Sequence, residues 1–293
     1  MQQVVTLIAA PGAEGELRAA VAGMQVDWLA PGACDIAGVS EAETRAAVGE
    51  QRIDIIVQPV GRRRKKLLVA DLESTIIENE MLEELADFLG LRAPVAEITR
   101  RAMNGEIDFI AALNERVALL RGLPESVLGE AAGRIRLMPG AATLIATLRR
   151  AGVKTALVSG GFTVFAERVA AALGFDRVVA NRLDIADGKI AGTVRPPIVT
   201  GATKRDTLVS LAAEFGFGQD DTLAVGDGAN DLPMLAAAGL GVAFHAKPAV
   251  AAAARWRIEH ADLTGLLYAQ GYEGTEICRP GESRDPIFGA RGG

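Results

Sequence analysis

The chain has 293 residues, of which 49% are hydrophobic and 23% are charged, as in an average soluble globular protein. It carries 31 basic and 37 acidic residues, and the net charge of −6 argues against a broad surface for nucleic acid or for an anionic membrane. Its two cysteines lie far apart, no stretch reaches the roughly 18 apolar residues of a membrane span, and the N-terminus lacks the basic start of a signal peptide. We therefore expect a soluble cytoplasmic protein that binds neither nucleic acid nor membrane.

Residues 1–62 are typical of a small α/β module. Strand-like and helical segments alternate there, at 4–10, 14–24, 34–39, 41–50 and 52–60. No cluster of acids, His or Lys collects in these segments. We therefore favour a packing or dimerisation module, with a homodimer as the corresponding assembly, over a ligand site.

The segment GRRRKK, residues 61–66, places five basic residues in a row. Such a block can bind phosphate or nucleic acid. Because the rest of the chain is acidic, we favour a solvated linker that marks the boundary between the N-terminal module and the next domain.

The segment LLVADLESTII, residues 67–77, is an apolar run that ends abruptly in polar side chains. Such a run predicts a strand buried on both faces. Asp71 and Glu73, followed by Ser74 and Thr75, then lie at its carboxyl end. In open α/β sheets ligands bind at this end of the strands, so we expect the functional site here.

Residues 78–136 carry apolar residues at helical spacing and contain no strand pattern. Pro and Gly divide them into about four helices, at 78–90, 93–105, 107–122 and 124–135. A helical insertion directly after the first strand of a sheet predicts a cap over the end of that strand.

Strands and helices alternate again after residue 136, which predicts a mostly parallel sheet. The strand-like segment 153–161 ends at Ser159 with Gly160 and Gly161, and the segment 221–231 ends at Asp227. A helix from residue 201 has Lys204 in its first turn, and ADGK at 186–189 predicts a hairpin. This domain extends to about residue 272, and residues 273–293 lack periodicity and predict an irregular tail.

The polar strand ends share one edge of a parallel sheet, so their side chains should converge. Asp71, Glu73, Asp227 and Asp231 would repel one another, and a cation would neutralise them. Oxygen ligands at this density suit Mg²⁺. Together with Lys204 and a glycine-rich turn that can hold an anion, they are suited to phosphoryl transfer with a carboxylate nucleophile.

At this point the sequence resembles the haloacid dehalogenase superfamily, and closely its phosphoserine phosphatases. Four motifs occur in the family's order over about residues 67–265: DLEST, SGGF, Lys204 and GDGAND. The resemblance implies an α/β fold with a Rossmann-like core, a helical-bundle cap and a small N-terminal module of ferredoxin or ACT type. It also implies Mg²⁺-dependent hydrolysis of O-phospho-L-serine through an aspartyl phosphate, a step of L-serine biosynthesis.

The resemblance implies a role for each motif residue. Asp71 would be the nucleophile, and Glu73 would protonate the leaving oxygen and then activate water. The magnesium ion would be held by the Asp71 carboxylate, the backbone carbonyl of Glu73 and Asp227, with support from Asp231. The phosphoryl group would be held by Ser159, the backbone of Gly160 and Lys204, with Asn230 nearby.

The resemblance also implies a site for the amino-acid part of the substrate. Glu80 would bind its ammonium group, and Arg116 would pair with its carboxylate, for which a planar guanidinium is well suited. Met103 and Phe109 would close over the substrate.

Glu73 departs from the family, which has Asp at this position. The extra methylene moves the carboxyl by about 1 Å, and a misplacement of that size can cost on the order of a hundredfold in rate. Either the pocket accommodates Glu, or turnover is slow, or the reaction stops more readily at the phospho-enzyme. We favour accommodation, because the other site residues are present.

Two other functions remain open from the sequence. A phosphatase or phosphotransferase for another small phosphomonoester, such as phosphothreonine or phosphohomoserine, would differ by groups worth only ~1–3 kcal/mol in binding. The second is a sensor that binds a phosphorylated ligand without hydrolysing it, in which Glu73 would mark the loss of catalytic activity.

Overall fold

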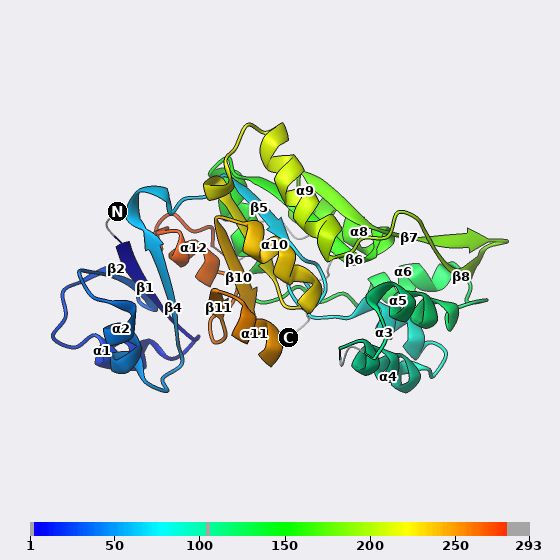
Figure 1. Cartoon of the computed structure of the whole chain (residues 1–293), viewed down its shortest axis with the longest axis horizontal. Helices are drawn as coiled ribbons and strands as arrows, with labels where there is room; N and C mark the ends of the chain where they lie inside the picture. Colours follow the sequence, from blue (N-terminus) through cyan, green and yellow to red (C-terminus); the bar gives the residue numbers. More distant parts are fainter. Residues whose placement is uncertain (1–2, 104–105, 280–293) are drawn as a thin grey trace.

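Two β-sheets organise the protein (Figure 1). The computed structural model describes residues 3–103 and 106–279, apart from the Met103 side chain. Among these residues, no helix combines the length and the apolar composition that crossing a membrane requires.

The N-terminal sheet has four antiparallel strands in the order β2-β3-β1-β4. With two helices the elements follow in the order βαββαβ, as in ferredoxin-like folds: β1 Gln3–Ala9, α1 Glu14–Ala20, β2 Val26–Ala30, β3 Ala33–Ala37, α2 Glu41–Val48 and β4 Ile53–Pro59. The sequence did not predict β2. This edge strand has five residues, none of them buried, so its VDWLA segment lacks the apolar face that marks a strand in the sequence.

The larger sheet has seven strands in the order β11-β10-β9-β5-β6-β7-β8, and all neighbours are parallel except β7 and β8. The prediction of a mostly parallel sheet is confirmed. Its strands are β5 Leu67–Ala70, β6 Lys154–Phe162, β7 Arg177–Ala186, β8 Lys189–Arg195, β9 Thr222–Gly226, β10 Leu240–Phe244 and β11 Trp256–Ile258. Because β5 lies between β6 and β9, the carboxyl ends of these three strands are adjacent.

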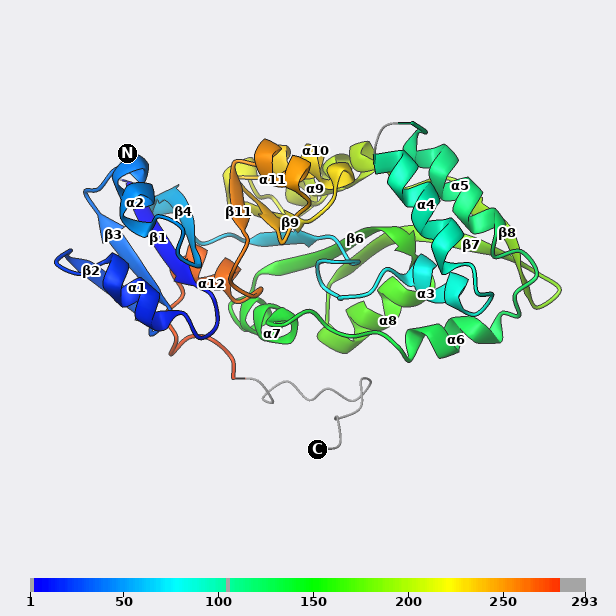
Figure 2. The ribbon, with the colours of Figure 1, turned by 90° about the horizontal axis from the view of Figure 1, so that it is seen from below.

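Helices cover both faces of this sheet (Figure 2). On one face lie α7 Ala141–Arg150 and α8 Thr163–Leu173, and on the other α9 Gly201–Glu214, α10 Leu232–Ala237 and α11 Pro248–Ala253. Alternate residues of β5 face the two layers: Leu68 packs in the core of the α7 and α8 face, and Leu67 and Val69 in the core of the α9 and α10 face. Burial on both sides explains why this strand is continuously apolar.

Helices α3 to α6 follow β5, and the described residues between them form no strand: α3 Met81–Asp87, α4 Arg92–Met103, α5 Phe109–Ala118 and α6 Ser126–Ala132. They lie on the side of the sheet toward which β6 points (Figure 2). The β7–β8 hairpin is bonded to the segment between α5 and α6. Gly122 N donates to Ile190 O at 2.9 Å, and Ile190 N donates to Leu123 O at 2.8 Å. The hairpin turn is Asp187–Gly188, with positive φ at both residues, as a tight two-residue turn requires.

The basic segment 61–66 is only partly the solvated linker that the sequence predicts: Arg62, Arg64 and Lys66 are exposed, but Arg63 and Lys65 are not. The side chain of Arg63 is 12% exposed and donates to Asp35 at 2.6 Å and to Thr6 at 2.8 Å in the N-terminal sheet. Lys65 is buried and donates to the carbonyls of Arg62 and Asp220 at 2.7 and 2.9 Å. These two charges have partners remote in sequence, which sequence patterns do not reveal.

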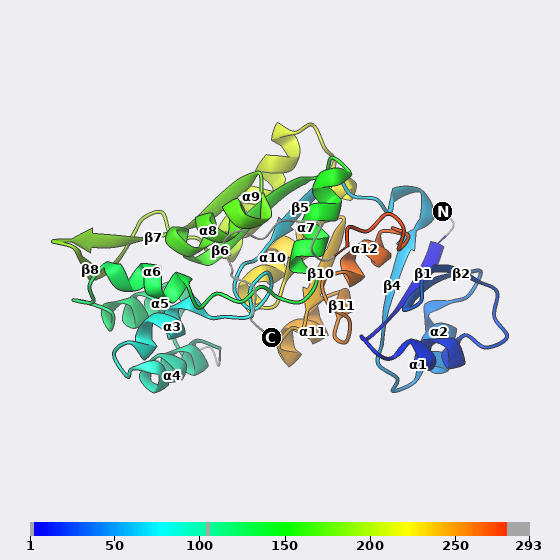
Figure 3. The ribbon, with the colours of Figure 1, turned by 180° about the vertical axis from the view of Figure 1, so that it is seen from behind.

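The N-terminal unit therefore packs directly on the larger domain. Helix α12, Gly265–Ala269, lies beside β4 in two views (Figures 1 and 3). Buried Gln58 donates to the Ala269 carbonyl at 2.7 Å, and buried Asp54 accepts from the amides of Glu259 and Ala261 at 2.8 Å. Residues 273–279 of the predicted irregular tail contain no helix or strand, and the remainder of the tail lies outside the described residues.

Candidate active site

Three buried aspartates meet at the carboxyl edge of the larger sheet. Asp71 directly follows β5, Asp227 follows β9, and Asp231 ends the short helix η3, Ala229–Asp231. One carboxylate oxygen from each lies within 4.8 Å of the others. The strand order explains this, because β5 and β9 are parallel neighbours.

Lys204 is fully buried among these acids. It lies in the first turn of α9, and its Nζ is 2.7 Å from Asp71 Oδ1 and 2.6 Å from Asp231 Oδ1. Burial alone would lower the pKa of Lys204, but the two carboxylates outweigh it and the net shift is upward. The lysine is therefore a fixed positive charge at physiological pH.

The acids remain in excess over this lysine. Burial raises the pKa of Asp71 well above its ordinary range, the Asp231 carboxylate adds to the increase, and Lys204 opposes it. Burial also raises the pKa of Asp227 to about 6, against the opposing charge of Lys247, whose Nζ lies 3.8 Å away. Three buried carboxylates and one ammonium leave uncompensated negative charge. The donor set consists of oxygens alone, so these residues fit a hard divalent cation.

A bulge in β6 shapes the neighbouring loop. Ser159 pairs with Ala180 of β7, but the next pair is Phe162 with Asn181, so Gly160 and Gly161 have no partner in the ladder. Ser159 Oγ accepts a hydrogen bond from Gly161 N at 2.8 Å. The sequence predicted that the strand ends at Ser159 in a strand-to-helix turn. The strand instead continues to Phe162, and the glycines lie in a bulge, a feature common beside active sites.

Asn181, which no sequence motif indicated, is hydrogen-bonded to the bulge at Gly160. It is buried, its Nδ2 donates to Gly160 O at 2.7 Å, and its Oδ1 accepts from Val199 N at 2.8 Å. It thereby connects the bulge to the segment before α9, which carries Lys204. An isolated Asn among the apolar residues of strand 177–186 is the one sequence feature that could have indicated this role.

Glu73 lies between the sheet edge and helix α3. Its Oε1 accepts from Met81 N, the first residue of α3, at 2.9 Å. Its carboxyl also lies against Gly161, where a Cβ would stand 2.8 Å from Oε2. Burial raises the pKa of Glu73 to about 8, the Glu80 carboxylate adds to the increase, and the Met81 hydrogen bond opposes it.

Glu80 and Arg116 approach the same region from the helical segment that contains α3 and α5. Glu80 directly precedes α3, and its Oε1 accepts from Ser74 Oγ at 2.7 Å. Arg116 on α5 donates to Thr99 Oγ1 and to the Ala112 carbonyl, each at 3.2 Å. Burial lowers the pKa of Arg116, while the charges of Glu73 and Glu80 raise it. The structure thus places this guanidinium within electrostatic reach of both carboxyls.

Phe109 and Asn230 flank Gly160. A Cβ on this glycine would lie 3.3 Å from Phe109 Cζ and 3.9 Å from Asn230 Nδ2, so a side chain here would press on the tip of the Phe109 ring. The side chain of Met103, the remaining predicted cap residue, lies outside the described residues.

Comparisons with known proteins identify the family. The sequence model of the haloacid dehalogenase-like hydrolases matches residues 68–236. The chain belongs to this family. It is 47% identical over 203 residues to phosphoserine phosphatase of Streptococcus thermophilus, a match that covers 69% of this chain and 94% of that protein. It is also 42% identical over 259 residues to phosphoserine phosphatase SerB2 of Mycobacterium tuberculosis, with 88% of this chain and 63% of that protein covered.

One solved structure is informative about the chemistry. It is a phospho-aspartyl intermediate analogue of phosphoserine phosphatase, with a TM-score of 0.66 and 39% identity over 70% of this chain and 98% of that chain. The chain spans less than two thirds of the length of several of its relatives, among them the proteins from Mycobacterium tuberculosis and Streptomyces coelicolor.

The raised pKa of Glu73 predicts how stability depends on pH. The folded protein binds the proton more tightly than the unfolded chain, so the free energy of unfolding falls as pH rises from about 4.5 to about 8. Glu73→Gln cannot ionise and should lack this part of the decrease. Urea unfolding at pH 5 and pH 9 in EDTA should therefore show that the variant gains stability relative to wild type at the higher pH. Equal pH dependence of the two proteins would contradict the assigned shift.

Proposed function

We propose that this protein is a Mg²⁺-dependent phosphoserine phosphatase that hydrolyses O-phospho-L-serine to L-serine and phosphate, as a step of L-serine biosynthesis. The observation that carries the proposal is the Asp71 carboxylate, held 2.7 Å from Lys204 Nζ beside two further buried aspartates. The relatives named phosphoserine phosphatase, at 42% and 47% identity, support the choice of substrate.

Asp71 would act as the nucleophile. A carboxylate oxygen attacks phosphorus, the bond between phosphorus and the serine oxygen breaks, and the phosphoryl group remains on Asp71. Lys204 neutralises charge on the phosphoryl oxygens, and Ser159 and the Gly160 backbone hold them, with Asn230 alongside. A magnesium ion held by the carboxylates of Asp71, Asp227 and Asp231 and the Glu73 carbonyl would add positive charge beside these oxygens.

Glu73 would move the protons. A pKa of about 8 keeps its carboxyl protonated near neutral pH, so it can protonate the leaving serine oxygen. The resulting carboxylate then takes a proton from the water that attacks phosphorus. Phosphate leaves, and both Asp71 and Glu73 return to their initial states.

The cap would recognise the amino-acid part of the substrate. Glu80 would bind the ammonium group, Arg116 would pair with the carboxylate, and Phe109 with Met103 would cover the substrate. The partly desolvated guanidinium of Arg116 favours this role, because Thr99 and the Ala112 carbonyl are its hydrogen-bond acceptors among the described residues and take two of its five N–H groups.

The proposal extends to the organisation of the chain. Residues 1–62 would form an accessory module with a homodimer contact, residues 67–272 the catalytic domain with its cap at about 78–136, and 273–293 a tail. A cytoplasmic location is consistent with Cys34 and Cys278, which are both buried free thiols.

Phosphate release tests the function directly. Wild type should release phosphate from phosphoserine with Mg²⁺ present and lose this activity in excess EDTA. Asp71→Asn removes the nucleophile and should lower kcat at least about a thousandfold. A preference for phosphothreonine or phosphohomoserine would favour the second candidate substrate class. No release from any phosphomonoester, with binding retained, would favour a sensor.

Substitution of Glu73 tests its role in proton transfer. Glu73→Gln keeps the shape but cannot donate an acidic proton, and kcat should fall about a hundredfold or more. In Glu73→Asp the carboxyl is one methylene too short to reach the Met81 amide, and we expect kcat to fall on the order of tenfold. If the Gln variant turns over phosphoserine as fast as wild type, residue 73 is not the acid–base group.

Arg116 should control recognition of the substrate carboxylate. Arg116→Ala should raise KM for phosphoserine at least about tenfold, because a partly buried charge partner is lost. KM for p-nitrophenyl phosphate, which has no carboxylate, should change little. Arg100→Ala is the matched control, since Arg100 lies exposed on the cap and pairs with Glu97. Equal effects of Arg116→Ala on both substrates would exclude the assigned contact.

A further inference from the structure

Two segments of the chain cross between the larger sheet and helices α3 to α6, residues 76–80 and 134–138. They pair with each other: Met138 N donates to Ile76 O and Glu78 N donates to Arg136 O, each at 2.9 Å, and Ile77 and Leu137 form an antiparallel bridge. Any movement of the cap relative to the sheet must bend these two segments.

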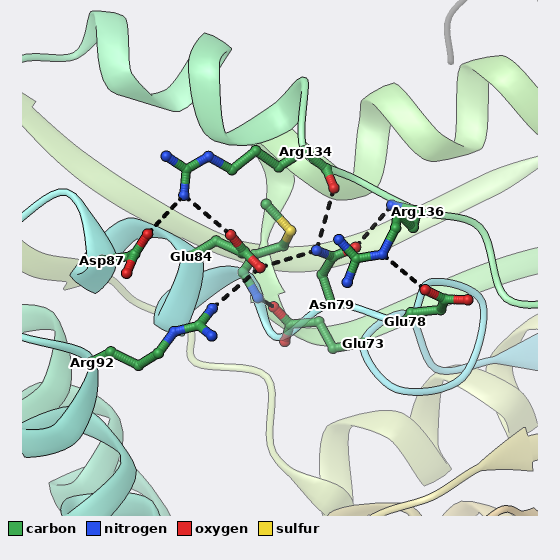
Figure 4. Close-up of polar contacts among 9 residues, drawn as sticks. Glu73, Glu78, Asn79, Glu84, Asp87, Arg92, Arg134 and Arg136 are labelled. Atoms are coloured by element: carbon green, nitrogen blue, oxygen red, sulfur yellow. Dashed lines mark hydrogen bonds and ion pairs between the residues drawn. The ribbon is translucent and has the colours of Figure 1, made fainter. Parts of the chain in front are cut away.

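Asn79 continues this pairing with its side chain (Figure 4). It is only 3% exposed. Its Oδ1 accepts from Arg136 N at 2.8 Å, and its Nδ2 donates to Glu84 Oε1 at 3.1 Å and to Arg134 O at 3.3 Å. One buried amide therefore joins the entering segment, the leaving segment and helix α3.

The ion pairs around Asn79 are more exposed. Glu78 and Arg136 pair at 2.9 Å with side chains 37% and 52% exposed, and Arg134 pairs with Asp87 at 3.0 Å on the surface. Exposed pairs of this kind contribute little to rigidity. Buried hydrogen bonds fix geometry more strongly, because an unpaired amide there has no water to replace its partner.

The two residues after Asn79 contact the candidate active site. Glu80 accepts from Ser74 Oγ at 2.7 Å, and Met81 N donates to Glu73 Oε1 at 2.9 Å. Asn79, Glu80 and Met81 are consecutive. Asn79 binds the segment 134–138, Glu80 binds the loop after Asp71, and Met81 binds the carboxyl of Glu73. Displacement of Asn79 would shift all three contacts together.

We propose that Asn79 is a positioning residue, which fixes the start of α3 so that the Met81 amide orients the carboxyl of Glu73 and Glu80 faces the substrate. The proposal rests on the proposed phosphatase function for its catalytic consequence. Its structural part, the coupling of Asn79 to the Met81 amide, is independent of any activity.

Hydrogen–deuterium exchange of the Met81 amide tests the structural part. Asn79→Asp retains the acceptor for Arg136 N but places a carboxylate oxygen against Glu84, and Asn79→Ala removes all three side-chain bonds. Both should accelerate exchange at Met81 about tenfold or more, with no change at core amides such as Val225 and Leu157. Glu78→Gln, which removes the exposed pair with Arg136, is the matched control and should leave Met81 unchanged. Unaltered Met81 exchange in both Asn79 variants would overturn the proposal.

Reversing the hydrogen bond between residues 79 and 84 should restore slow exchange at Met81. In the double variant Asn79→Asp with Glu84→Gln, the Gln amide can donate to the new carboxylate, and slow exchange at Met81 should return relative to Asn79→Asp alone. Glu84→Gln by itself serves as the reference, because it also weakens the contacts of Glu84 with Arg92 and Arg134. Exchange that stays fast in the double variant, while Glu84→Gln alone remains slow, would contradict the assigned contact.

Kinetics test the catalytic consequence. For Asn79→Asp we expect kcat/KM for phosphoserine to fall at least about tenfold, because the acid and the ammonium acceptor are both misplaced. For p-nitrophenyl phosphate, whose leaving group needs no proton and carries no ammonium, kcat/KM should stay within about twofold. Equal losses on both substrates would indicate a merely structural role. Absence of phosphoserine hydrolysis in wild type would refute the proposed function, while the exchange measurement would still decide the role of Asn79.

Discussion

The candidate site depends on the buried ion pairs of Lys204 with Asp71 and Asp231. A charged lysine without any exposure is tolerable only because two carboxylates lie within 2.7 Å of its Nζ. Removal of one partner from such a cluster typically costs about 3–5 kcal/mol, since it leaves a buried charge uncompensated. The cluster in turn requires that β5 and β9 end, and that α9 begins, at the same edge of the sheet. The order of the central strands therefore determines which charged side chains meet in the site.

The glutamate at position 73 changes how the sheet and the cap are connected. Its longer side chain reaches the Met81 amide at the start of the cap, and it has room because position 161 is a glycine. An aspartate with the same backbone would place its carboxyl about one methylene short of that amide. The structure thus accommodates the longer side chain of Glu73 between Gly161 and the Met81 amide.

The sequence predicted the features that depend on local patterns. The apolar run before Asp71, the hairpin turn at Asp187 and Gly188 and the parallel arrangement of the larger sheet follow from periodicity and turn chemistry. It did not predict β2, the bulge at Gly160, or the roles of Asn79 and Asn181. The two asparagines bind backbone groups that lie 18 to 57 residues away, and no short-range pattern records such partners.

The contacts of Arg63 and Lys65 lie close to the strand that leads to Asp71. Arg63 is bound to the N-terminal sheet. Lys65, two residues before the four-residue strand β5, is bound to the Asp220 carbonyl in the short helix that precedes β9. Lys65 therefore anchors the amino end of the strand that precedes Asp71, and Arg63, two residues earlier, connects the same segment to the N-terminal sheet. The contact between the two units therefore continues, through residues 63–65, to the short strand that ends before Asp71.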